Sequence, residues 1–379
     1  MEGAVYEIGA LRALEESLDG LDINDLHVYV GVSAGAFVAA GLVNGITPSQ
    51  MTRALVRHEP RQHPFVPGTF FTPAYREWAR RSLTLPLLVA RIVSKIARNP
   101  GDQTVLSALM RLARALPVGI FDNEPIRRFL ARSFALEGRS DDFRTLPHKL
   151  VVVSTDLGTG RPIRFGESGW DHVPISTAVQ ASTALPGLYP PVHIQGHDCV
   201  DGVLLRTVHA SVALEAGADL LLCINPLVPA DLGQVATGAT NGPIVKKGLP
   251  TVLSQTFRTL IHSRLKVGMA TYARRFPNAD VLLFEPSGDE YTMFFTNMFS
   301  FSARKKVCEL AYQSTRRHLR ARRAELEPVL ARHGIRIRDH LLEDEDRTVW
   351  DGVGMPEASA APVGAKLGRA LAHLEEALA

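Results

Sequence analysis

A serine between two glycines has the setting that a catalytic nucleophile requires. Gly31, Ser33 and Gly35 form the pattern G-x-S-x-G. The β-branched and aromatic run at 26–30 predicts a strand before it, and the residues after Gly35 favour a helix. Such a turn presents the serine hydroxyl at a helix N-terminus, where the helix dipole favours developing negative charge. The pattern predicts Ser33 as a nucleophile. The alternative is an ordinary turn in which serine is the helix N-cap.

An aspartate much later in the chain supplies a candidate base. Asp201 and Gly202 follow a predicted hairpin at 192–200, which turns at Gly196. A carboxylate within hydrogen-bond distance of a serine can remove its proton without a histidine. Gly202 would let the backbone pass close to such a site. The alternative is that Asp201 caps its own turn, as aspartates before glycine commonly do.

Both motifs, together with three further stretches, resemble the patatin-like phospholipase family. The family carries a glycine-rich oxyanion loop, then G-x-S-x-G, then a D-G-[GA] triplet. The further stretches occur in the family's order and are residues 3–16 (GAVYEIGALRALEE), 154–160 (STDLGTG) and 181–191 (ASTALPGLYPP). The resemblance spans roughly residues 3–226.

The resemblance implies an acyl hydrolase that acts on lipid esters without a cofactor. It assigns Ser33 as nucleophile, Asp201 as general base and Gly3 as the last glycine of the oxyanion loop. The Ala34 amide at the helix start is a second candidate oxyanion donor. The substrates implied are fatty-acyl esters such as phospholipids, lysophospholipids or neutral glycerolipids, cleaved through an acyl-enzyme.

Two departures from the family pattern bear on this interpretation. Val203 stands where the family has glycine or alanine, and a β-branched residue disfavours positive φ. A hydrophobic strand and three more glycines precede the family's equivalent of Gly3, whereas this sequence begins at Met1. We expect that the natural chain starts further upstream. The alternative is a truncated, catalytically silent protein that binds lipid or membrane.

Composition indicates a globular protein and excludes several classes. The 379 residues are 46% hydrophobic and 21% charged with a net charge of +3, which favours neither disorder nor nucleic-acid binding. Three scattered cysteines predict reduced thiols in a cytoplasmic protein. His193 and His197 flank a hairpin turn close to Cys199. We expect ordinary strand residues there and no metal site.

Alternating segments predict an α/β fold with a central, mostly parallel sheet covered by helices on both faces. The runs at 149–153 and 220–224 are largely apolar, which is typical of buried parallel strands. We expect a catalytic domain over residues 1–226 with a helical insertion at about 60–125. A C-terminal helical part over 227–350 would pack on it, followed by a linker and terminal helix at 351–379.

Two basic segments raise the possibility of contact with an anionic membrane. Residues 85–98 have one apolar helical face edged by arginine and lysine, so they could lie on a bilayer, cover the acyl pocket or pack in the core. A second run at 316–323, within a helix expected at 302–326, is either a solvated face or a lipid-headgroup site.

One competing mechanism remains from the sequence. An α/β-hydrolase triad would need a histidine after Ser33, and His209 or His262 could be nominated. Against it, the serine motif lies nearer the N-terminus than is usual in that fold.

Overall fold

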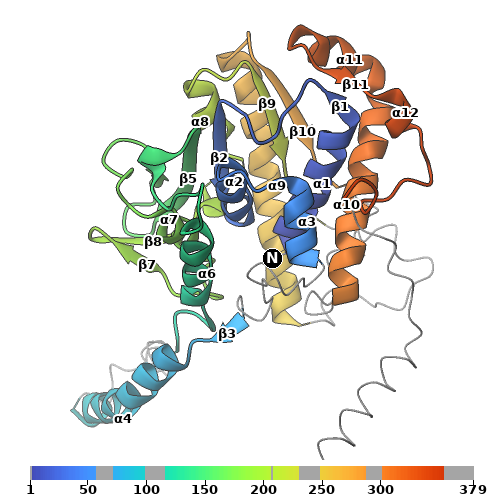
Figure 1. Cartoon of the computed structure of the whole chain (residues 1–379). Coiled ribbons are helices and arrows are strands. Elements are labelled where there is room, and N and C mark those ends of the chain that lie inside the picture. The colour runs from blue at the N-terminus through green and yellow to red at the C-terminus, as the bar shows by residue number, and fades with distance from the viewer. Residues whose placement is uncertain are drawn as a thin grey trace, which may run out of the picture.

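The computed structural model describes residues 2–56, 71–98, 116–205, 208–229, 248–286 and 301–353. Helices and strands are intermixed along this part of the chain, as Figure 1 shows. The mixed α/β class predicted from the sequence is therefore confirmed. Within these ranges, no helix is both long enough and apolar enough to cross a membrane.

A five-stranded mixed sheet forms the centre. Strand β2 (Val28–Val32) runs parallel to β5 (Lys149–Asp156). Strands β6 (Pro162–Phe165) and β8 (His197–Asp201) pair antiparallel with β5, and β7 (Val192–Ile194) pairs antiparallel with β8.

The expectation of a mostly parallel sheet is corrected by these pairings. Strands β7 and β8 are joined only by Gln195 and Gly196, both with positive φ, and a two-residue hairpin forces antiparallel pairing. Parallel pairing needs a long crossover connection. It occurs between β2 and β5, and between β9 (Leu220–Ile224) and β10 (Asp280–Phe284), which form a separate two-stranded sheet.

Two short antiparallel ribbons complete the strands. Strand β1 (Leu18–Asp19) pairs with β11 (Arg336–Ile337), and β3 (Thr72–Pro73) pairs with β4 (Phe121–Asp122). The first ribbon joins the two ends of the described chain. The second forms the stem of a projecting arm.

The helices surround the sheet and account for most of the remaining described residues. They are α1 (Glu2–Ser17), α2 (Ala34–Val43), α3 (Pro48–Val56), α4 (Tyr75–Arg98), α6 (Glu124–Phe134), α7 (Ile175–Ser182), α8 (Ala210–Glu215), α9 (Leu249–Arg275), α10 (Phe301–Ala321), α11 (Arg323–Arg332) and α12 (Asp339–Leu342), with 3-10 turns η3 (Phe143–Thr145) and η4 (Gly202–Leu204). The helix expected at 302–326 is thus divided at Arg322. Of the linker and terminal helix expected at 351–379, residues 354–379 lie outside the described residues.

Strand β5 is buried on both sides, as its apolar run predicts. Leu150 and Val152 belong to the main core, which they share with α1 and α2. Val151 and Val153 point to the opposite face and pack against Val212 of α8. Alternation along the strand sends successive side chains to opposite faces, so helices cover the sheet on both sides. The predicted division into domains at residue 226 stays a prediction; β10 pairs with β9 across it.

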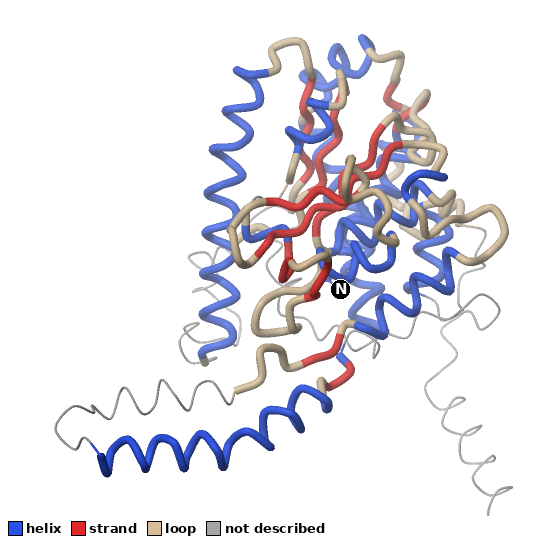
Figure 2. The backbone as a smooth tube through the Cα atoms, turned by 90° about the vertical axis from the view of Figure 1, so that its left-hand side faces the viewer, coloured by secondary structure: helices blue, strands red, loops and turns tan. Residues whose placement is uncertain are grey.

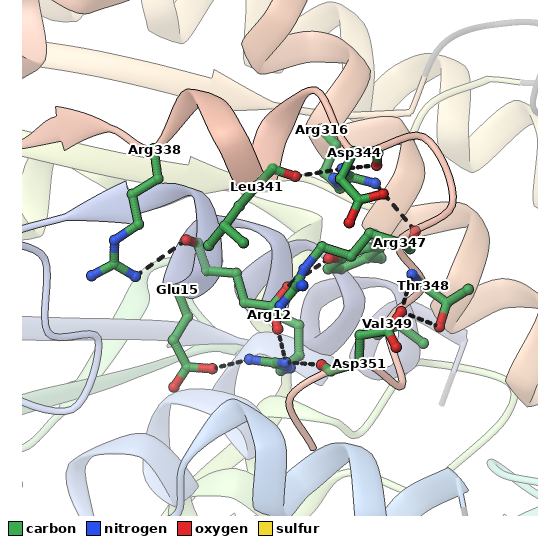
Figure 3. A network of polar contacts seen from close by, with 12 residues as sticks. Arg12, Glu15, Arg316, Arg338, Leu341, Asp344, Arg347, Thr348, Val349 and Asp351 are labelled. Atoms are coloured by element: carbon green, nitrogen blue, oxygen red, sulfur yellow. Dashed lines mark hydrogen bonds and ion pairs between the residues drawn. The ribbon is translucent and has the colours of Figure 1, made fainter. Parts of the chain in front are cut away.

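A polar network fastens the C-terminal segment to α1 (Figure 3). Glu16, at the end of α1, accepts hydrogen bonds from Arg12, from the Tyr312 hydroxyl and from Arg347 Nε. Arg316 is almost fully buried and donates to backbone carbonyls at Leu341, Leu342, Asp344 and Arg347. Arg316 therefore belongs to neither a solvated face nor a headgroup site, the two interpretations that the sequence left open for this basic run.

Candidate active site

Ser33 occupies a strained turn between β2 and α2. Its φ is 54° and its ψ is −123°, a conformation that L-residues rarely adopt. A Cβ on Gly31 would lie 2.4 Å from Ala36 Cα, so only glycine fits there. Ser33 is the N-cap residue of α2, yet its side chain makes no capping hydrogen bond. The hydroxyl is thus not used in the way that an ordinary N-cap serine uses it.

A second serine, Ser182, accepts a hydrogen bond from the backbone of this turn. The Ser33 amide donates to Ser182 Oγ at 2.9 Å, and the Ser182 hydroxyl donates to the Val153 carbonyl at 2.7 Å. Ser182 ends α7 and is fully buried. Sequence reasoning quoted it only as part of a family-like stretch and gave it no role. Gln180 and Thr183 are polar residues of the same helix end, so the sequence offered no signal that singles out Ser182.

Asp201 reaches Ser33 because two strands meet end to end along one edge of β5. Val32, the last residue of β2, pairs with Val153, and Asp201, the last residue of β8, pairs with Ser154. Strand β6 pairs with β5 over 152–155, which overlaps both registers, so β6 occupies the other edge. Strands β2 and β8 therefore share an edge and point their carboxyl ends at each other.

The Asp201 carboxyl is enclosed and lies near the Ser33 side chain. It is 1% exposed, and Oδ1 accepts a hydrogen bond from the Val203 amide at 2.9 Å. Burial raises the pKa of Asp201 to about 7, although the Val203 amide and the Ser33 side chain act to lower it. Asp201 caps its own turn, and this bond leaves the carboxyl close enough to Ser33 for the serine to affect its pKa.

The residues after Asp201 fit the site without strain. A Cβ on Gly202 would lie 2.4 Å from the Val153 carbonyl oxygen, which explains the need for glycine. Val203 belongs to η4, and the non-glycine residues with positive φ in the described ranges are Ser33 and Gln195. The sequence-based concern about valine at this position does not apply, because the turn requires no positive φ from it.

Two helix N-termini converge beside the serine. A Cβ on Gly3 would lie 3.1 Å from Ala34 Cβ, so the first turns of α1 and α2 are in contact. Amides in a first helical turn have no partner within the helix and carry the positive end of its dipole. The structure thus brings Gly3 and Ala34 together, and the adjoining amides can hold an oxyanion.

Glu7 is a second buried carboxyl near the serine that sequence reasoning missed. A Cβ on Gly35 would lie 3.5 Å from both Glu7 oxygens, so the carboxyl lies against the first turn of α2. Burial raises its pKa to about 8. The group is therefore mostly neutral at pH 7.

The two nominated histidines have recorded partners other than Ser33. His209 is buried, with Nε2 3.4 Å from the carbonyl oxygen of Gly202, the residue after Asp201, and His262 Nδ1 is 3.9 Å from Glu285. His193 pairs with Asp198, and His197 pairs with Asp156. No His, Cys, Asp or Glu groups in the described ranges are arranged to hold a metal ion.

Comparison with known proteins decides the family. The sequence model for the family described as patatin-like phospholipase matches residues 2–214. The chain belongs to the patatin-like phospholipase family. Membership places it among lipid acyl hydrolases at the level of the family.

A solved structure similar to this patatin-like chain is that of VipD from Legionella pneumophila. The two share 17% sequence identity over 62% of this chain, with a TM-score of 0.30. The chain spans 50% of the VipD chain's length.

Proposed function

We propose that the protein hydrolyses fatty-acyl esters of lipids by means of a Ser33–Asp201 dyad. The observation that carries this proposal is the meeting of the carboxyl ends of β2 and β8, which brings Ser33 close to the buried Asp201 carboxyl, whose pKa is about 7. A base with a pKa near the working pH combines a useful ionised fraction with the ability to accept a proton.

In the first step the Ser33 oxygen attacks the ester carbonyl carbon while Asp201 takes the hydroxyl proton. The tetrahedral oxyanion is held by amides at the starts of α1 and α2, around Gly3 and Ala34. The ester C–O bond then breaks, and Asp201 returns the proton to the departing alcohol oxygen. An acyl-serine remains.

In the second step water attacks the acyl-serine and Asp201 again takes the proton. When the second tetrahedral intermediate collapses, the bond between the acyl carbon and Ser33 Oγ breaks, Asp201 returns its proton to Oγ, and the fatty acid is released. This sequence needs no metal or organic cofactor. Phospholipids, lysophospholipids and neutral glycerolipids are the substrate classes expected of the family, and the protein would meet them at a membrane surface from the cytoplasmic side.

The test compares three variants of the natural full-length protein on a p-nitrophenyl acyl ester. We expect Ser33→Ala to lower kcat/KM by about 10⁴-fold or more, and Asp201→Asn by about a thousandfold. The matched control is Asp198→Asn, because Asp198 is an exposed carboxylate three residues away on the same strand. It should retain wild-type activity.

Full activity in Ser33→Ala or Asp201→Asn would refute the dyad. A folded wild-type protein that binds lipid vesicles without hydrolysing any ester would instead support a silent lipid-binding protein.

A further inference from the structure

Helix α4 projects from the body as a separate arm (Figures 1 and 2). Its described side chains are mostly exposed, and many of the exposed ones are apolar: Leu83 is 78% exposed, Leu87 64% and Val93 60%. Tyr75, Trp78 and Val89 are exposed as well. Soluble monomers rarely leave so much apolar surface uncovered on one element, so this surface indicates a binding partner.

The charge of the arm is strongly one-sided. The α4 sequence contains a single acidic residue, Glu77, and its basic residues are Arg76, Arg80, Arg81, Arg91, Lys95 and Arg98. Glu77 is already engaged by Arg80 and Arg81. Arg91 is exposed beside the apolar side chains of the arm. An amphipathic helix with this charge is complementary to an anionic lipid surface.

The arm is joined to the segment that positions the candidate base. At the stem, the Phe121 amide of β4 donates to the Leu188 carbonyl at 2.8 Å. A Cβ on Gly119, just before β4, would lie 2.3 Å from the Pro190 nitrogen, so the chain entering the stem packs tightly on the loop between α7 and β7. Earlier in the same loop, the Ala184 carbonyl accepts a hydrogen bond from the Asp201 amide at 3.0 Å.

Exposed apolar residues continue from the arm toward the site. The exposed residues are Leu116, Val118 and Ile120, which lie just before β4 of the stem, and Leu188 on the loop between α7 and β7. Helix α1, which carries Gly3, starts at the end of the body from which the arm leaves (Figure 1). The exposed apolar surface and the candidate site therefore belong to one end of the molecule.

We propose that α4 and its stem dock the protein on an anionic lipid bilayer, with Ser33 at the end that faces the membrane. This surface extends the proposed function, on which its purpose rests, by naming how the enzyme reaches aggregated substrate. A second copy of the chain could also cover apolar side chains. The excess of positive charge opposes pairing of two such arms and favours anionic lipid.

Vesicle co-sedimentation tests the proposal in a Ser33→Ala background, so that turnover cannot alter the lipids. The vesicles contain phosphatidylcholine alone or mixed with phosphatidylglycerol. Arg80→Glu/Arg91→Glu should weaken binding to the anionic vesicles by at least about thirtyfold, since each basic residue near such a surface contributes about a factor of five. Val89→Glu/Val93→Glu should weaken binding to both kinds of vesicle.

The matched control is Leu136→Glu/Arg336→Glu, which alters an exposed leucine and an exposed arginine away from the arm. It should bind like the parent protein, and thermal melting checks that every variant is folded. Equal vesicle binding by the arm variants and the parent would overturn the proposal. So would a change from dimer to monomer in the arm variants with vesicle binding unaltered, because a second copy would then cover the arm.

The two proposals can fail separately. Vesicle binding that depends on the arm, without ester hydrolysis by the parent enzyme, would leave the docking surface standing and remove the dyad. Hydrolysis of a soluble short-chain ester without vesicle binding would support the dyad and remove the docking surface.

Discussion

Two buried carboxyl groups in this molecule have opposite surroundings. Glu16, at the end of α1, is met by Arg12 and Arg347 and by the Tyr312 hydroxyl (Figure 3). Asp201, at the end of β8, accepts a hydrogen bond from the Val203 amide and lies near the Ser33 side chain. Both side chains are buried. They differ in whether a guanidinium group pairs with the carboxyl.

That difference separates a structural carboxylate, Glu16, from the candidate base, Asp201. A buried charge is costly unless it is paired, and the guanidinium groups around Glu16 provide that pairing. No arginine or lysine of the described ranges is recorded as acting on Asp201, and burial raises its pKa to about 7. The buried Glu16 carboxylate therefore holds the C-terminal segment against α1 through its arginine partners. Burial of Asp201 instead raises its affinity for a proton.

The largest predicted effect is the loss of stability in Glu16→Gln. Removing this charge leaves the buried Arg12 with Glu15 alone and takes the anion from the partly buried Arg347, and it weakens the bond from the Tyr312 hydroxyl, which together should lower the free energy of unfolding by about 3–5 kcal/mol. Urea denaturation measures it. The control is Glu15→Gln, because Glu15 is more exposed and pairs with Arg12 alone. Equal stability of the two variants would show that the network is not structural.

Asp201→Asn should change stability with the opposite sign. The folded pKa of Asp201 lies above its ordinary value of 3.8, so the native state loses relative stability as pH rises from about 4 through about 7. Asparagine does not titrate and removes this penalty, which gives a gain of about 2–4 kcal/mol at pH 8 and little at pH 4. Glu7→Gln should behave similarly, because the pKa of Glu7 is also raised.

Urea denaturation at the two pH values measures this gain. A variant that is less stable than the parent at pH 8 would contradict the origin that we assign to the raised pKa.

The pH dependence of hydrolysis should follow the ionisation of Asp201. Asp201 must be unprotonated to accept the serine proton, so kcat/KM should fall tenfold per pH unit below about 7 and level off above it. Initial rates on an ester with a pH-independent leaving group measure this profile. A plateau extending unchanged to pH 5 would exclude a base with the raised pKa of Asp201.

The smallest predicted effect is that of replacing Ser182, which accepts the hydrogen bond from the Ser33 amide. Ser182→Ala leaves the Ser33 amide and the Val153 carbonyl without their partner, which should destabilise the fold by about 1–3 kcal/mol and lower kcat/KM about tenfold. Ser176→Ala is the control, since Ser176 is also buried on α7 but bonds Asp141. Ser176→Ala should lower stability but leave kcat/KM of the folded protein unchanged. Identical rate losses would make Ser182 merely structural.

Sequence reasoning found the parts of the site that are encoded locally. Ser33 and Asp201 were identified from short motifs, and the apolar run at 149–153 located β5, because neighbouring residues determine a turn or a buried strand. The mixed pairing of the sheet was missed, since it depends on the register of β8 against β5. Ser182 and Glu7 were missed because their partners are distant in sequence. The oxyanion roles of Gly3 and Ala34 stay predictions.

Labelling with a fluorophosphonate probe tests the central claim most directly, because the probe reacts only with an activated serine. We predict that the natural full-length protein is labelled at Ser33, identified by peptide mass, that Glu16→Gln is labelled once folded, and that Asp201→Asn is not. A folded protein without labelled Ser33, or labelling that is unchanged in Asp201→Asn, would contradict the assignment of these two residues as a catalytic pair.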